Sequence, residues 1–386
     1  MDFNPKYPDI SYLRDRAQKR IPRFAFEYLD GGCNSGVNLQ RNTDEIRQVQ
    51  LKPYYLRAHG QASLATELFG KAYDAPFGMS PIGLQGLMWP NASEILAKAA
   101  FEHNIPFILS TVATASLEKI SEITEGNAWF QLYHPVEDQL RDDLLRRLEE
   151  ARYPVLVILS DVPTFGYRSK EIINGLAIPP RMTLRNMLQI MGRPAWALQT
   201  LMAGQPSFKT LTPYIPKRAN LKHLGIFMNK IFSGRLTEDK ISAIRDKWKG
   251  KLVLKGVASV EDTETAIKLG LDGIIISNHG GRQLDHGQST IASLRPIVAK
   301  YQNQIKIMVD SGMRTGPDIA SVLATGAEFT FLGRSFMYGV SALGKKGGNH
   351  TVAILKRQLT QVMEQLGCDH VQDLPNHLIS ANENQP

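Results

Sequence analysis

Eight short apolar runs, rich in Val, Ile, Leu and Phe, recur along the chain from residue 77 onward and alternate with amphipathic segments of helical length. Buried parallel strands have such near-continuous apolar sequences, and crossover helices separate them. The expected strands are 77–81, 106–110, 128–133, 155–161, 252–256, 272–277, 305–310 and 328–333. The clearest expected helices are 91–103, 136–151, 259–269, 289–300 and 316–325. Eight successive units of this kind predict an α/β fold, a (β/α)8 TIM barrel, with a doubly wound parallel sheet as the alternative.

The segments outside this rhythm divide the chain further. We expect one domain over 1–386, with the barrel at about 77–345 and an N-terminal helical segment at 1–76 that becomes irregular towards its end. A C-terminal helix is expected at about 346–367, and an insertion at 162–236 follows the fourth strand. Compact domains rarely carry so long a connection without a purpose such as a lid or a binding surface.

Charge and cysteine content narrow the class of protein. The 45 Lys and Arg against 37 Asp and Glu give a net charge of +8. These basic residues are scattered without a basic run, so anionic ligands or an anionic membrane surface explain the excess better than nucleic acid does. Cys33 and Cys368 form no disulfide framework, which favours a reducing cytosol. The first residues do not resemble a signal peptide, and no run approaches the roughly 20 apolar residues of a membrane span.

Polar or ionisable residues end nearly every predicted strand. In a barrel, these positions meet at the C-terminal mouth, where active sites are built. The residues concerned are Ser80, Pro81, Ile82, Gly83, Ser110, Thr111, Gln131, Tyr133, Asp161, Lys255, Ser277, His279, Arg282, Asp310, Gly312, Gly333 and Arg334. Taken singly, each is more simply a helix cap, a turn residue or a solvated strand end. Taken together, they predict a site.

The chemistry of that site follows from the residue types. Glycines after the last two strands allow backbone N–H groups to approach a phosphate, and Arg314 and Arg334 add positive charge. His279 and Asp161 suit a general base and its orienting partner, and Lys255 suits a developing anion. The sequence has no G-x-G-x-x-G after a strand, no P-loop and no metal-ligand spacing among its nine histidines. We therefore predict a phosphate-bearing cofactor, no metal, and proton abstraction next to an anion.

The segment SNHGGRQLD at 277–285 resembles the FMN-dependent L-2-hydroxy acid dehydrogenase and oxidase family. WFQLY, LVLKG and DSGMRTG stand in the matching order around it, and the resemblance runs from about residue 12 to residue 374. It implies an FMN cofactor, a small lactate- or mandelate-like 2-hydroxy acid as substrate, the 2-oxo acid as product, and a homo-oligomer such as a tetramer.

The same resemblance assigns roles to individual residues. It implies that His279 is the base, that Asp161 stabilises its protonated form, and that Arg168 and Arg282 hold the substrate carboxylate. Tyr28 and Tyr133 would contact the substrate, and Lys255 would face the reduced flavin. The residues implied to line the isoalloxazine are Pro81, Ile82, Gly83, Ser110, Gln131 and Ser277, and those implied for the ribityl and phosphate groups are Asp310, Gly312, Arg314, Gly333 and Arg334.

Three positions refine the resemblance. Leu159 stands where many members have a Thr, and Val112 stands where glycolate oxidases often have an aromatic residue. Gly83 resembles the dehydrogenases of the family, whereas the oxidases more often carry Ala. Leu159 implies one hydrogen bond fewer to the flavin, and Val112 argues against a glycolate-sized pocket. Gly83, together with the apolar and basic insertion, favours electron transfer to quinone or another carrier. The alternatives are an oxidase that reduces O2 to H2O2, an FMN barrel isomerase, and a flavin-binding barrel without catalysis. The sequence is compatible with both a carbanion and a hydride route.

Within the insertion, LKHLGIFMNKIF at 221–232 has apolar residues near one helical face, and basic residues from Lys217 onward flank it. A helix of this kind can lie on anionic lipid, which predicts a cytoplasmic protein that contacts the inner face of the membrane through 217–232. A lid helix packed on the barrel mouth and a subunit contact are the alternatives, because amphipathic helices usually cover a core.

Overall fold

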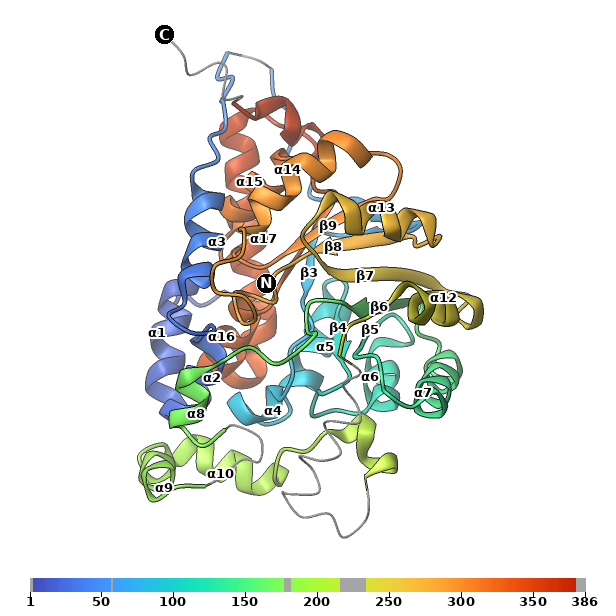
Figure 1. Cartoon of the computed structure of the whole chain (residues 1–386). Helices are drawn as coiled ribbons and strands as arrows, with labels where there is room; N and C mark the ends of the chain where they lie inside the picture. The colour runs from blue at the N-terminus through green and yellow to red at the C-terminus, as the bar shows by residue number, and fades with distance from the viewer. Residues whose placement is uncertain (1–2, 57, 177–181, 216–233, 380–386) are drawn as a thin grey trace.

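The computed structural model describes residues 3–56, 58–176, 182–215 and 234–379. Its central element is a sheet of eight parallel strands in the order β3-β10-β9-β8-β7-β6-β5-β4 (Figure 1). A parallel bridge between Met79 and Phe107 joins the two end strands and closes the barrel. The strands are β3 Phe77–Met79, β4 Ile108–Ser110, β5 Trp129–Leu132, β6 Val155–Leu159, β7 Lys251–Val257, β8 Gly273–Ile276, β9 Lys306–Asp310 and β10 Phe329–Leu332. The predicted (β/α)8 barrel is confirmed, and each expected strand overlaps an observed one.

Helices follow the strands and pack outside the barrel. They are α5 Ala92–Glu102, α6 Leu117–Thr124, α7 Asp138–Glu150, α12 Glu238–Lys247, α13 Val260–Lys268, α14 Thr290–Tyr301, α15 Gly316–Ala324, α16 Arg334–Leu343 and α17 Gly347–Leu366, with the short α4 at Gln85–Met88 and the 3-10 turns η2 Gly344–Lys346 and η3 Val371–His377. Several begin at side-chain caps; Ser259, for example, accepts from the backbone N–H of Asp262. Helices α5, α13, α14 and α15 contact the strands directly, and α17 packs on α5, α15 and α16.

The N-terminal region is not wholly helical. After α1 Ile10–Arg20, α2 Arg23–Asp30 and α3 Val37–Arg47, the chain forms an antiparallel hairpin of β1 Thr66–Leu68 and β2 Lys71–Tyr73 that sequence analysis missed. Its turn residues Phe69 and Gly70 both have positive φ, the geometry of a tight hairpin turn in which Asn-Gly is more usual. Leu68, Phe69 and Tyr73 pack onto the aromatic and aliphatic residues inside the barrel. The hairpin therefore plugs the barrel, and an atypical turn sequence concealed it.

The insertion after β6 contains α8 Ser169–Ile173, α9 Leu184–Met191, α10 Pro194–Ala203 and the 3-10 segment η1 Lys209–Tyr214. In Figure 1, α9 and α10 lie side by side beyond α2 and α4, away from the barrel strands. Trp196 of α10 fixes this arrangement, because its indole N–H donates to the carbonyls of Leu87 and Met88 and its ring meets Phe24 edge-on. The expected amphipathic helix at 221–232 lies outside the described residues. Among the described helices, none combines the length and the apolar character that a membrane crossing requires.

Candidate active site

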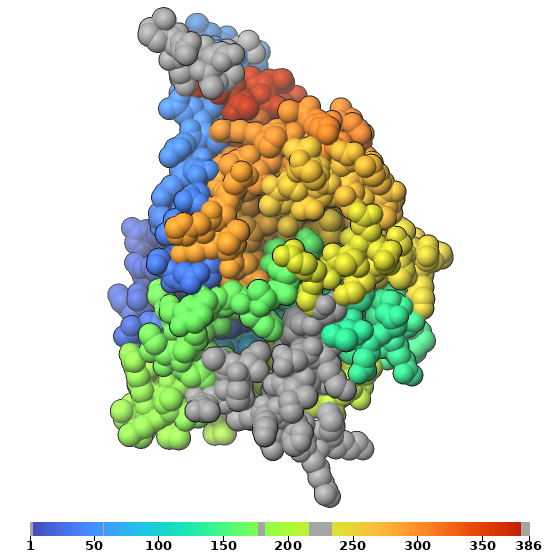
Figure 2. Space-filling model, in the orientation of Figure 1, coloured from blue at the N-terminus to red at the C-terminus, as the bar shows by residue number. Residues whose placement is uncertain are grey.

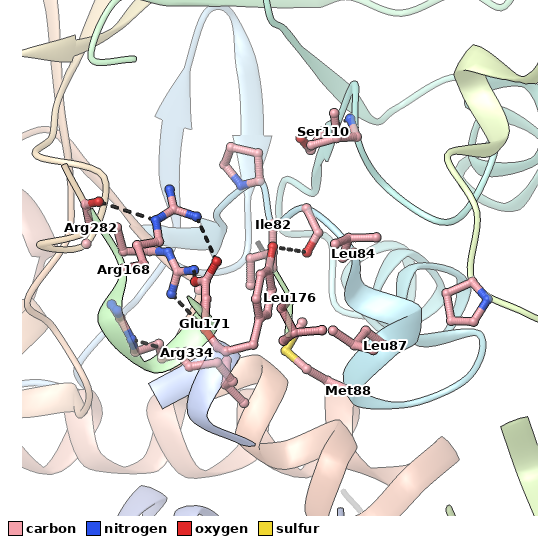
Figure 3. A pocket seen from close by; sticks show the side chains of 18 of the residues that line it. Ile82, Leu84, Leu87, Met88, Ser110, Arg168, Glu171, Leu176, Arg282 and Arg334 are labelled. Carbon is pink, nitrogen blue, oxygen red and sulfur yellow. Dashed lines mark hydrogen bonds and ion pairs between the residues drawn. The ribbon is translucent and has the colours of Figure 1, made fainter. Parts of the chain in front are cut away.

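The strand ends, α2, the loop before α4 and the insertion enclose a cavity of about 1650 Å³. Every residue that the sequence assigned to the substrate lines it, as do most of those assigned to the cofactor. In Figure 3 the charged side chains of Arg168, Glu171, Arg282 and Arg334 gather on one side of the cavity. Two of the assigned residues, Asp161 and Ser277, do not line the cavity themselves. Asp161 contacts the lining residue His279, and Ser277 contacts the lining residue Lys255. The mouth therefore brings together residues that lie more than 300 positions apart.

His279 stands on a loop with unusual backbone geometry. Its φ is +58°, which is uncommon for a residue with a side chain, and Gly280 and Gly281 follow with φ of +68° and +70°. The Ser277 hydroxyl accepts the N–H of His279 at 3.1 Å, and the Ser311 hydroxyl accepts that of Gly280 at 2.8 Å. Backbone strain of this kind is commonly held in place at functional sites. The loop needs glycines because two successive left-handed residues must follow His279.

Asp161 and His279 form the first of three charged groups in the site. The Nδ1 of His279 lies 2.9 Å from Oδ1 of Asp161. Burial lowers the pKa of His279, and Asp161 opposes that effect without reversing it. Burial alone would raise the pKa of Asp161, but His279 and Lys255 lower it overall. The pair thus combines an ionised carboxylate with an imidazole that is neutral near pH 7, the protonation states that a general base and its partner require.

Lys255 is the second group. It is buried, and its Nζ lies 2.9 Å from Oδ2 of Asp310 and 2.9 Å from Oγ of Ser277. Burial would lower the pKa of this amine, but Asp310 and Asp161 raise it overall, so it stays charged. Ser80 and Ser311 also donate to Asp310, which fixes the carboxylate against the lysine. Lys255 is therefore a buried cation at the centre of the barrel mouth.

The third group is a pair of guanidiniums that share a carboxylate which sequence analysis missed. Arg282 forms an ion pair with Glu171, and Nη1 of Arg168 lies 3.5 Å from the same carboxylate (Figure 3). Burial and then repulsion by Arg168 lower the pKa of Arg282. Arg168 and Glu171 stand at the i,i+3 spacing of a helix turn, a signal that could have indicated Glu171. Two arginines with one acid leave a net positive charge that suits an anionic substrate.

Gln283 is a second residue that sequence analysis missed. Its side-chain oxygen accepts from Arg168 and from the backbone N–H of Gly166, and its amide nitrogen donates to the carbonyls of Asp161 and Thr164. It therefore ties the loop after β6 to the loop after β8.

Two tyrosines complete the substrate side. Tyr28 lies under Arg282, with the guanidinium carbon 5.0 Å from its ring centre. Burial raises the pKa of Tyr28 and of Tyr133, so both hydroxyls remain protonated.

The remaining walls of the cavity fit the ring system and the phosphate of a flavin. Among the described residues, the amide nitrogen of Gln131 is buried without a hydrogen-bond partner and so can donate to a ligand. Burial and then repulsion by Arg314 lower the pKa of Arg334 to about 9, and a phosphate would offset both effects. Gly312, which lines the same cavity, has φ of +93°, and a Cβ there would come within 2.7 Å of Ile46, so its backbone packs directly against α3. The described residues contain no cluster of three or more His, Cys, Asp or Glu suited to a metal ion.

Comparison with known proteins assigns the family. The family model described as FMN-dependent dehydrogenase matches residues 17–381. The chain belongs to this family. FMN is accordingly its cofactor, in agreement with the sequence prediction and with the phosphate-binding features of the cavity.

Relatives and solved structures resemble the chain over nearly its whole length. It is 34% identical over 371 residues to a putative L-lactate dehydrogenase of Mycobacterium tuberculosis, covering 96% of this chain and 88% of the relative. It is 33% identical to (S)-mandelate dehydrogenase of Pseudomonas putida, covering 96% and 93%. A crystal structure of a monotopic membrane protein, (S)-mandelate dehydrogenase, matches with a TM-score of 0.90 at 32% identity, covering 96% and 98%. A mandelate oxidase structure matches with a TM-score of 0.82 at 27% identity, covering 95% and 97%.

Proposed function

We propose that this protein oxidises an L-2-hydroxy acid to the 2-oxo acid and passes the electrons to a quinone or another membrane carrier. The observation that carries the proposal is the joint placement of three groups in one cavity: the His279–Asp161 pair, Lys255, and the Arg168–Arg282 pair. The lactate and mandelate dehydrogenases among its relatives act on substrates of this class by name. A barrel isomerase or a non-catalytic flavin protein would have no need of the two arginines beside a base.

Each group has a defined task. Arg168 and Arg282 bind the substrate carboxylate, with Tyr28 and Tyr133 beside them, and so fix the hydroxyl-bearing carbon. His279 takes a proton from the substrate, and Asp161 stabilises the resulting imidazolium. FMN, when bound, would supply the acceptor for the two electrons and the second hydrogen that leave the substrate. Lys255 is the buried cation that would stabilise negative charge on the cofactor.

The electron acceptor is inferred from the insertion. Leu184 and Met191 of α9 and Leu201 of α10 are 75%, 68% and 80% exposed. An exposed apolar surface of this kind is typical of a membrane or protein contact. The structurally similar mandelate dehydrogenase is described as a monotopic membrane protein. We therefore place the protein peripherally on the membrane, where quinones are found. The second candidate function is an L-2-hydroxy acid oxidase that passes the electrons to O2, since mandelate oxidase shares the fold.

Anaerobic mixing with L-lactate and with L-mandelate tests the activity. Bleaching of the flavin absorbance by either acid is the expected result, and an unchanged spectrum with both acids would contradict 2-hydroxy acid oxidation by that site. Admission of air then tests the acceptor. We expect reoxidation by O2 to be much slower than reoxidation by a short-chain quinone. Reoxidation by air at a rate that matches turnover would show that the protein is an oxidase and not a dehydrogenase.

A further inference from the structure

The cavity extends beyond the residues assigned to FMN and to the substrate carboxylate. Its whole volume is about 1650 Å³, which leaves room beside the cofactor for more than a small acid, since ordinary small-molecule pockets measure roughly 300–1,000 Å³. Beyond the arginines it continues under α9 and α10. We call this part the apolar arm, and its main walls are Leu87, Met88, Leu176, Ile190, Trp196 and Phe208. Figure 3 shows Leu87 and Met88 on the side of the cavity opposite the arginines.

The walls of the apolar arm are tied to the body of the protein. Besides the hydrogen bonds of Trp196 to the last two carbonyls of α4, the Gln189 side chain of α9 accepts the backbone N–H of Phe24 at 3.0 Å. Arg193, between α9 and α10, donates to the carbonyl of Ile21. The arm is thus part of the folded structure and is held by contacts to α2 and its flanks.

The two ends of the cavity differ sharply in charge. The arginine end carries Arg168, Arg282 and Glu171. In contrast, among the described residues 182–215, none of those that line the cavity is ionisable. The polar side chains among them are Asn186, Thr200, Gln205 and Ser207, and the other walls of this part are apolar. A charged ligand would lose its hydration there without gaining an ionic partner. The cavity therefore fits a ligand with an anion at one end and an extended apolar group at the other.

The arm reaches the molecular surface at apolar residues. Met182 and Leu201 both line the cavity and are 61% and 80% exposed. They belong to the same segment whose exposed apolar face we propose to lie on the membrane, at the lower left of Figure 2. An amphiphilic molecule could enter here from lipid with its chain trailing towards the surface.

We infer that the apolar arm binds the side chain of the substrate, and that the preferred substrates are L-2-hydroxy acids with medium to long aliphatic chains. The carboxylate binds to Arg168 and Arg282, the hydroxyl carbon lies beside His279, and the chain occupies the arm. This inference rests on the proposed 2-hydroxy acid oxidation and adds the substrate class.

A chain-length series with a water-soluble dye as acceptor tests the inference on the holoenzyme in detergent-free buffer. The substrates run from L-lactate through L-2-hydroxybutyrate and L-2-hydroxyhexanoate to L-2-hydroxyoctanoate and L-2-hydroxydecanoate. We expect kcat/KM to rise about fourfold per methylene that enters the arm, which corresponds to the ~0.8 kcal/mol of one buried methylene. If L-lactate is oxidised but the series is flat or falls, the inference is wrong and the oxidation itself stands. If neither L-mandelate nor any acid of the series is oxidised, both are wrong.

A matched pair of variants locates the effect. Ala197 of α10 lines the arm, whereas Ala195 of the same helix is exposed and does not. Ala197→Phe should lower the ratio of kcat/KM for L-2-hydroxydecanoate to that for L-lactate at least tenfold, because the new ring fills the arm. Ala195→Phe should leave the ratio unchanged. If Ala197→Phe fails to retain flavin, Ile190→Thr takes its place and should lower the ratio about fivefold.

The competing occupant is the tail of a quinone acceptor. In that case Ala197→Phe would raise the KM for long-chain quinones and leave the dye-coupled chain-length series unchanged. Such a result would overturn the inference and assign the apolar arm to the acceptor. An aromatic side chain is a further competitor, and a kcat/KM for L-mandelate well above that for every aliphatic acid would likewise overturn it.

Discussion

At the barrel mouth nearly every ionisable side chain has a partner, whereas α9 and α10 of the insertion expose a series of apolar side chains to solvent. Asp161, His279, Lys255 and Asp310 contact one another directly or through Ser277. Leu184, Met187, Leu188, Met191, Leu198, Leu201 and Met202 of α9 and α10 are all more than half exposed. This contrast fits the chemistry proposed for the mouth and the membrane contact proposed for the insertion. Changes in the first should affect chemistry, and surface changes in the second should affect location.

The largest expected effect is at His279. His279→Gln should retain FMN but lose about 10²- to 10⁴-fold in turnover, because it removes the proton acceptor. The measurement is dye-coupled kcat, with flavin content read from the visible spectrum. His286→Gln is the control, since His286 is exposed. A His279→Gln enzyme that keeps more than about a tenth of its turnover would mean that another group is the base.

Arg168 should be the next most sensitive position. Arg168→Lys keeps the charge but loses the planar fork that can hold a carboxylate, so KM should rise and kcat should fall together. A combined loss of about 10- to 100-fold in kcat/KM is expected for charge-assisted hydrogen bonds of this kind. Arg295→Lys on the exposed face of α14 is the matched control. Unchanged steady-state constants with both L-lactate and L-mandelate would remove Arg168 from the substrate site.

Substitutions on the surface of the insertion should weaken membrane binding and leave turnover nearly unchanged. The double variant Met187→Glu, Leu188→Glu places two charges on the exposed face of α9 and should weaken co-sedimentation with anionic vesicles on the order of 10²-fold or more, because each buried apolar side chain contributes roughly 1.5–3 kcal/mol. Dye-coupled turnover of L-lactate should stay within about twofold of the unmodified protein. Phe101→Glu, on α5, controls for the added charge. If the double variant still binds vesicles as well as the unmodified protein does, α9 does not take part in the membrane contact.

A smaller effect concerns pH. Only neutral His279 can accept a proton, so kcat/KM should fall as the pH drops through its pKa, which burial holds below the ordinary value of 6.5. Asp161 raises that pKa relative to burial alone, so Asp161→Asn should move the acid limb of the profile to lower pH while lowering the plateau. The profile of kcat/KM against pH checks both. An acid limb that moves to higher pH in the variant would contradict the assignment of the titrating group.

Much of the fold and of the mouth followed from local sequence. Buried parallel strands are continuous apolar runs, so all eight could be located, and their polar ends had to meet at one mouth because parallel strands share a direction. The pairing of His279 with Asp161 and the cavity position of Arg282 agree with that expectation, and Arg168, which only the family resemblance implied, lines the same cavity. The catalytic and binding roles of these residues stay predictions.

Other features depended on contacts that no local pattern records. Glu171 reaches Arg282 across 111 positions of sequence, and the β1–β2 hairpin is stable because it plugs the barrel, despite a Phe-Gly turn. Helix α10 is apolar nearly all round, and the amphipathic α9 exposes its apolar residues, so periodicity could not say which face of either helix packs on the protein. The sequence by itself determined the barrel and the residue types at its mouth, because both follow from short-range patterns. Only the tertiary structure decided the partners of the arginines and the course of the apolar arm, because these depend on which distant segments pack together.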